Sequence, residues 1–157
     1  MATRSIQDWF HAYGESHRNA TNKAIHWVCV PIIYFCVVGF LWGIPMPIAP
    51  PFLGPHLLAK IGVGLVGLFY LRISFPIMIG MILWSVLCLA LCSYLEAYGP
   101  WPLWVICSVL FVAAWIGQFY GHKVEGKKPS FLHDLQFLMI GPAWLMGFIY
   151  RRLGIAY

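Results

Sequence analysis

Long stretches without any charged side chain constrain this sequence more than any other feature. No Asp, Glu, Lys or Arg occurs between Lys23 and Lys60, between Arg72 and Glu96, or between Glu96 and Lys123. A helix needs about 20 predominantly apolar residues to cross the ~30 Å hydrocarbon core of a bilayer. Since the backbone must satisfy its own polar groups inside lipid, such runs form helices. The sequence therefore predicts an all-α, polytopic membrane helical bundle.

Four transmembrane helices are expected within a single integral-membrane domain that occupies residues 1–157. The second is the least regular, because Lys60 interrupts it close to one end, where its long side chain can reach the interface. The expected spans cover about residues 24–42, 53–71, 75–95 and 101–120.

The two ends of the chain are expected to lie at the membrane surface. Residues 1–23 are polar with interspersed aromatic side chains, a pattern that favours a cytoplasmic amphipathic helix in the interface. Residues 123–157 form a loop and a C-terminal apolar segment that is too short for a comfortable span and contains Gly141-Pro142. A broken re-entrant or interfacial helix is expected there, acting as a lid over the site.

The positive charges give the bundle an orientation. Lys and Arg precede the first span, follow the last one and include Arg72 between the second and third, whereas the other two loops contain none. By the positive-inside rule both tails face the cytoplasm. The net charge of +5 is too dispersed for nucleic-acid binding. We expect a multi-pass protein of a bacterial inner membrane, or of the endoplasmic reticulum in a eukaryote, surrounded by membrane lipids and compatible with a homo-oligomer.

Histidines near the ends of the spans are candidate metal ligands. Imidazole is costly in hydrocarbon and is the commonest side chain that holds a transition metal. His17 and His26 are nine residues apart, so one straight helix would place them on opposite faces. The stretch from Asn19 to Asn22 favours a break that brings both to one side. Alternatively, either imidazole bonds lipid headgroups at the interface.

His122 closes the last span and is separated from His26 by four crossings. An even number of crossings returns the chain to its starting face, so early and late histidines can meet on the cytoplasmic side. Glu125 follows three residues later on the same helix face and could orient a ligand histidine. It could equally be a surface carboxylate paired with Lys127 or Lys128.

His133 would reach the same face of the membrane. With Asp134 it reads either as a fourth ligand or as a simple capping pair. An all-nitrogen and oxygen ligand set without thiolates suits iron or zinc. The five cysteines lie inside the expected spans, where buried thiols serve as small apolar side chains.

Several spaced motifs resemble a small multipass membrane family of 2-hydroxy fatty acid (2-hydroxypalmitate) dioxygenases, formerly a domain of unknown function, whose characterised fungal member resides in the endoplasmic reticulum. The resemblance covers nearly the whole chain. It rests on Tyr13-x3-His17-x4-Asn22-x3-His26-x4-Pro31, on Gln118-x2-Gly121-His122-x2-Glu125-Gly126-x2-Pro129, on Gly141-Pro142, and on Arg152-Leu153-Gly154.

The resemblance implies a ferrous iron, Fe(2+), and an α-oxidation in which a 2-hydroxy fatty acid and dioxygen give a fatty acid one carbon shorter. It implies iron ligands at His17, His26 and His122. His133 is the candidate fourth ligand on its position in the sequence alone. Glu125, Asn22 and Tyr13 are the candidate catalytic residues.

Two other functions are compatible with the residues alone. A bis-histidine haem protein could carry electrons in the membrane, although haem ligands in bundles usually come from facing helices in the interior. A Soret band would identify it. A non-catalytic membrane scaffold would keep any lipid-processing phenotype when His26 or His122 is changed to Ala.

Overall fold

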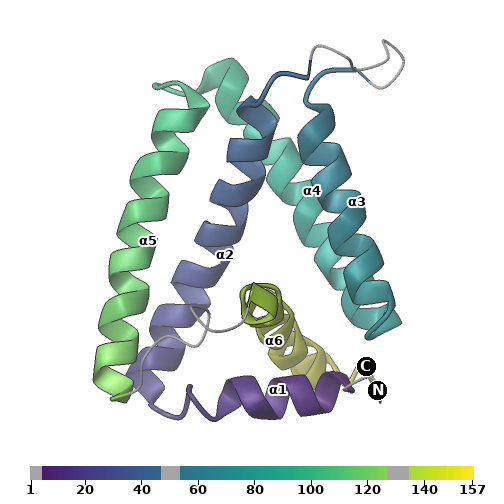
Figure 1. Ribbon diagram of the computed structural model, residues 1–157, viewed down its shortest axis with the longest axis vertical. Coiled ribbons are helices and arrows are strands. Elements are labelled where there is room, and N and C mark those ends of the chain that lie inside the picture. The colour runs from purple at the N-terminus through teal and green to yellow at the C-terminus, as the bar shows by residue number, and fades with distance from the viewer. Residues whose placement is uncertain (1–4, 47–53, 127–134) are drawn as a thin grey trace.

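The computed structural model describes residues 5–46, 54–126 and 135–157, and within these ranges the chain is entirely helical, without strands. The expected all-α class is therefore confirmed. The helices, coloured along the chain in Figure 1, are α1 (Ile6–Gly14), α2 (Ala20–Gly43), α3 (Leu57–Leu71), α4 (Phe75–Tyr98), α5 (Leu103–Glu125) and α6 (Leu135–Leu153).

Of the helices in the described ranges, α2, α4 and α5 are long and apolar enough to span a membrane. This is consistent with the membrane protein expected from the sequence. The apolar helix α3 has only 15 residues. At 1.5 Å per residue it extends about 22 Å, less than the ~30 Å of a hydrocarbon core. Four crossings therefore stay a prediction.

The long helices run up and down, so that sequence-distant segments meet at one end (Figure 1). The α2 helix leaves the end at which α1 and α6 lie, α3 returns towards it, α4 leaves again and α5 comes back. The most extensive contact is between α2 and α5, followed by that between α3 and α4. The start of α2 and the last turn of α5 therefore lie side by side.

Two glycines on α5 allow its close approach to α2. A Cβ atom at Gly117 would lie 2.7 Å from Cys29 Sγ, and one at Gly121 would lie 2.5 Å from Asn22 Oδ1. Small residues at a helix interface let the backbones come together in this way. The two glycines are one helical turn apart and hold α5 against the first half of α2.

The N-terminal helix uses its apolar face differently from the prediction. The helix occupies only Ile6–Gly14 of the polar region 1–23, and its apolar side chains Ile6, Phe10 and Tyr13 are buried. They pack on α6, where the Tyr13 and Trp144 rings lie 5.3 Å apart. The apolar side chains of α1, which were expected to lie in the membrane interface, thus pack against α6.

The C-terminal helix is a single element and is not broken at Pro142, contrary to the expected interruption. Tyrosine hydroxyls anchor it to the bundle. Tyr70 of α3 donates a hydrogen bond to the carbonyl of Met139, and Tyr150 of α6 donates one to the carbonyl of Pro76 at 2.6 Å. Through these contacts α6 is fixed beside the lower ends of α3 and α4 in Figure 1.

Candidate metal centre

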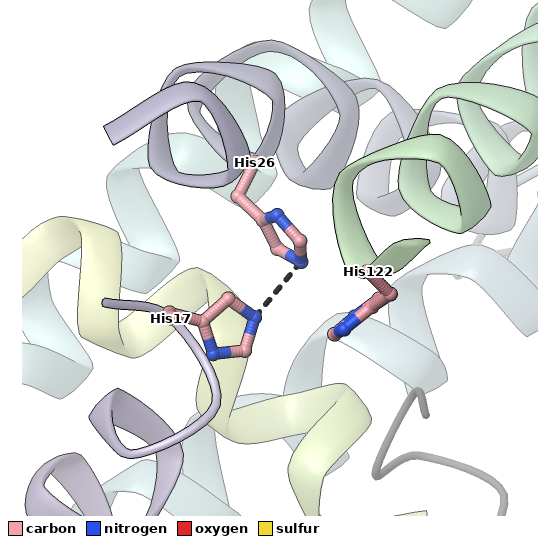
Figure 2. A group of neighbouring side chains, drawn as sticks. All are labelled: His17, His26 and His122. Atoms are coloured by element: carbon pink, nitrogen blue, oxygen red, sulfur yellow. Dashed lines mark hydrogen bonds between the residues drawn. The ribbon is translucent and has the colours of Figure 1, made fainter. Parts of the chain in front are cut away.

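Three histidines from separate parts of the chain converge at the end of the bundle where α2 begins. His17 comes from the turn between α1 and α2, His26 from the second turn of α2, and His122 from the last turn of α5 (Figure 2). One ring nitrogen from each lies within 4.8 Å of the other two, and all three residues are buried. The fourth candidate, His133, lies outside the described residues.

Backbone carbonyls fix the tautomers of two of these rings. His17 Nδ1 lies 2.7 Å from the Tyr13 carbonyl oxygen, and His26 Nδ1 lies 2.9 Å from that of Asn22. Because a carbonyl only accepts, each Nδ1 carries the proton and donates it, which leaves a lone pair on each Nε2. These two Nε2 atoms face each other at 2.9 Å.

Two lone pairs at this separation repel unless a cation lies between or beside them. A proton is a poor candidate at neutral pH, since burial lowers the pKa of His17 from 6.5 to about 4. In addition, His122 Nδ1 is buried without a hydrogen-bond partner in the described part of the chain. Three neutral imidazoles with one orphaned nitrogen fit a transition metal such as iron or zinc.

Glu125 ties the turn that carries His17 to the helix that carries His122. Its carboxylate accepts hydrogen bonds from the backbone N–H groups of Arg18, at 2.8 Å, and Asn19, at 2.9 Å. It also accepts one from the Asn22 amide at 3.0 Å. Glu125 therefore holds the backbone beside His17 against the last turn of α5.

Asn22 supports the centre from the interior. Its side chain is fully buried, and its amide donates to the Ser16 carbonyl at 3.3 Å as well as to Glu125. Its own backbone carbonyl receives the His26 Nδ1–H. Gly121 makes room for this side chain, as described above. Asn22 thus connects the His17 turn, the His26 ring and α5.

Tyr13 lies directly against the centre. Its ring stacks on the His17 imidazole, with centroids 4.1 Å apart and planes 11° apart. Burial raises the pKa of the Tyr13 phenol well above its usual value, so the hydroxyl stays protonated. Of the three candidate catalytic residues, Tyr13 is the one that lines the cavity beside the histidines.

An apolar cavity of about 210 Å³ extends from the three histidines into the bundle. Tyr13, Gln118 and the histidines form its polar end, and Gly141 and Pro142 of α6 also line the cavity. The remaining walls are aliphatic and aromatic side chains of α2, α3 and α5, among them Val30, Ile33, Tyr34, Val38, Leu41, Val63, Val66 and Trp115.

Gln118 belongs to the motif around His122, but no role was predicted for it from the sequence. Gln118 is buried, lines the cavity and contacts the His26 imidazole. Its position one turn before His122 in an otherwise apolar helix is a usable indication, because polar side chains inside a span are functional candidates. Trp144, with its ring 5.5 Å from that of His17, carries no such indication in the sequence.

His56 lies at the opposite end of the bundle. Its Nδ1 donates to the Trp42 carbonyl at 2.8 Å, and its Nε2 lies 3.3 Å from a Glu96 carboxylate oxygen. These contacts join the end of α2 to the start of α3 and the end of α4. His56 is therefore a histidine with its own contacts, away from the candidate centre, and it serves below as a control position.

Together, the fold and the site define a class: all-helical proteins with long apolar helices and a buried three-histidine cluster at the head of an apolar cavity. Residues 3–153 match the family model described as 2-hydroxy-palmitic acid dioxygenase Mpo1-like. The chain belongs to this family, which confirms the resemblance noted in its motifs. No curated protein and no solved structure gives a significant match.

Proposed function

We propose that this protein is a membrane iron-dependent dioxygenase that shortens 2-hydroxy fatty acids by one carbon. Membership of the Mpo1-like family supports the substrate and the reaction class. The observation that carries the proposal is the pair of inward-facing Nε2 atoms of His17 and His26, 2.9 Å apart at the head of an apolar cavity. This arrangement combines a cation site with a place for an acyl chain.

The proposed reaction balances without an external reductant. One 2-hydroxy acid and one dioxygen molecule contain the atoms of the shortened acid, carbon dioxide and water. The bond between the carboxyl carbon and the hydroxylated carbon breaks, and the hydroxylated carbon becomes the new carboxyl group. The two carbons together lose four electrons, which is the number that reduces dioxygen fully. Protein side chains lack such redox chemistry, and iron supplies it when bound.

The protein's own groups would hold the iron and the acid. His17, His26 and His122 would bind the metal, with the Nδ1 protons of the first two committed to carbonyls so that each Nε2 is free to coordinate. Gln118 is placed to bind the head of the substrate, because its amide can both donate to a carboxylate and accept from a hydroxyl. The apolar walls would receive the acyl chain and exclude water.

The structure is compatible with a site at the cytoplasmic surface of a four-span protein. Arg18, Lys23 and Lys123 lie in the sequence immediately beside the histidines, at the end where α2 begins and α5 finishes. Positive charge there agrees with the positive-inside rule. In this arrangement α3 is the short span, and Lys60 lies in its first turn, at the end of the bundle away from the histidines. Dioxygen, membrane lipids and further copies of the chain remain proposed partners.

The geometry does not favour a haem. Axial imidazoles of a bis-histidine haem lie on opposite faces of the macrocycle, whereas His17 Nε2 and His26 Nε2 are only 2.9 Å apart. A non-catalytic scaffold would not require three buried imidazoles, two of them with Nε2 lone pairs that face each other. The visible spectrum of the purified protein tests the first alternative, and activity measurements test the second.

The direct test is anaerobic purification with Fe(II), followed by addition of 2-hydroxypalmitate and air. We expect pentadecanoic acid and carbon dioxide in equal amounts without added reductant. His26→Ala and His122→Ala should abolish the product, whereas His56→Ala should retain it. Absence of both product and bound iron in the wild-type protein would reject the proposal.

A further inference from the structure

We propose that Leu41 and Gly62, at the far end of the cavity, set the longest acyl chain that the protein accepts. This inference rests on the proposed function, because it assigns the acyl tail of the same substrate to a particular part of the cavity. It requires the tail to run straight from the histidines along α2, rather than to leave the protein partway.

The cavity follows α2 turn by turn. Besides His26, it is lined by Val30, Tyr34, Val38 and Leu41, which share one face of the helix. Leu41 is fifteen residues beyond His26, a distance of about 22 Å at 1.5 Å per residue. The cavity thus has its polar group at one end and a defined apolar end.

This length can be compared with that of an extended hydrocarbon chain. With carbon–carbon bonds of about 1.5 Å and angles of about 111°, each carbon advances an extended chain by about 1.25 Å. A path of about 22 Å therefore holds roughly sixteen to eighteen carbons. Longer acids would have to bend or leave their ends outside.

The α3 wall, which faces α2 across the cavity, comes close to α2 at Leu41. Ala59, Gly62, Val63 and Val66 of α3 line the cavity at spacings that place them on one helix face. A Cβ atom at Gly62 would lie 2.8 Å from Leu41 Cδ1, so the two helices meet there with no spare room. Any added atom at Gly62 must push the Leu41 side chain, and any larger side chain at Leu41 fills the end of the path.

The cavity also has a side opening, which supplies the competing route. Val37 and Leu65 line it and yet are 41% and 62% exposed. The volume of about 210 Å³ is below the ~300–1,000 Å³ of pockets that enclose a whole ligand. A long chain therefore lies in a groove that is open on one side between α2 and α3. The opening offers entry from lipid, and the uninterrupted lining as far as Leu41 favours the straight path for the bound tail.

Photo-crosslinking under anaerobic conditions tests the path without turnover. The probe is a sixteen-carbon 2-hydroxy acid that carries a diazirine at its last carbon, and the labelled residues are identified by mass spectrometry. We expect labelling of Leu41, Gly62 and Ala59. Labelling confined to Val37 and Leu65, or to the detergent, would overturn the proposal, since the tail would then leave through the side opening.

Competition against this probe by unlabelled acids gives the second readout. In Leu41→Trp, 2-hydroxypalmitate should compete about tenfold less well, whereas 2-hydroxydecanoate should compete as in the wild type. Gly62→Ala should shift the preference in the same direction by less, and it covers the case in which the larger substitution fails to fold. Leu68→Trp, on the exposed side of α3, is the matched control and should change neither. Unchanged competition by the long acid in both cavity variants would refute the assignment, whether or not any product forms.

Discussion

The three hydrogen bonds accepted by Glu125 join the turn that carries His17 to α5. A substitution at Glu125 that replaces one oxygen atom tests whether these bonds position the histidines. Glu125→Gln preserves the size of the side chain but replaces one carboxylate oxygen by an amide NH₂ group. One of the three donors, the backbone N–H of Arg18, the backbone N–H of Asn19 or the Asn22 amide, then faces another donor. The negative charge beside the N-terminus of α2 is lost as well.

The magnitude follows from these contacts. A hydrogen bond to a charged group contributes about 1.5–3 kcal/mol, and the partial exposure of Glu125 places its backbone bonds at the lower end. The charge at the helix N-terminus adds about 0.3–1 kcal/mol. We expect the free energy of unfolding to fall by about 2 kcal/mol, because one hydrogen bond and the charge at the helix terminus are lost while two of the three bonds can still form. Since the turn carrying His17 is loosened, metal affinity should fall about 10- to 100-fold.

Metal affinity is measured by competition with a chromophoric chelator under anaerobic conditions, together with thermal unfolding of the metal-free protein. Glu96→Gln is the control, since that carboxylate bonds Trp42 and His56 at the other end of the bundle. It should alter stability without altering metal affinity. Equal metal affinity in Glu125→Gln and the wild type would refute the positioning role, even if stability fell.

Further predictions concern helix contact and pH. Gly121→Ala should destabilise the protein by about 1–3 kcal/mol and weaken metal binding, because the added Cβ would overlap Asn22. The control Gly64→Ala, which has open space around it, should be neutral or stabilising by up to ~1 kcal/mol. Chemical unfolding of both variants measures the difference. Since the pKa of His17 is lowered from 6.5 to about 4, its neutral form contributes stability above pH 6.5 that is lost as the pH falls towards 4. Metal retention measured against pH should therefore fall near pH 4–5, and half-release at pH 6.5 would contradict the burial of this ring.

Much of the architecture follows from the sequence because lipid is a demanding solvent. Uncharged runs of this length have few other stable solutions than helices, and an up-and-down course of four helices returns His122 to the vicinity of His26. Helix ends are less well determined. The α2 helix begins at Ala20, since Asn19 accepts from the backbone of the first turn, while hydropathy alone suggested a start at residue 24.

Other features could not be obtained from local patterns. The apolar stripe of Tyr13 and its neighbours has the same spacing whether it faces lipid or α6, so only the packed structure distinguishes the two. Pro142 can be accommodated within a helix when neighbouring groups satisfy the backbone, and the sequence does not show those neighbours. The cavity could not be predicted either, because a valine that lines a groove, such as Val38, cannot be distinguished in the sequence from one that faces lipid.

We propose that three histidines, brought together by the fold from distant positions, hold one iron ion. Iron per chain after anaerobic reconstitution and removal of excess metal tests it most directly, in the wild type, His17→Ala, His26→Ala, His122→Ala and the control His56→Ala. We expect about one ion per chain in the wild type and the control, and a large loss in each of the other three. Iron retained at the wild-type level in those three variants, or a wild-type protein that binds none, would show that these histidines do not form the iron site.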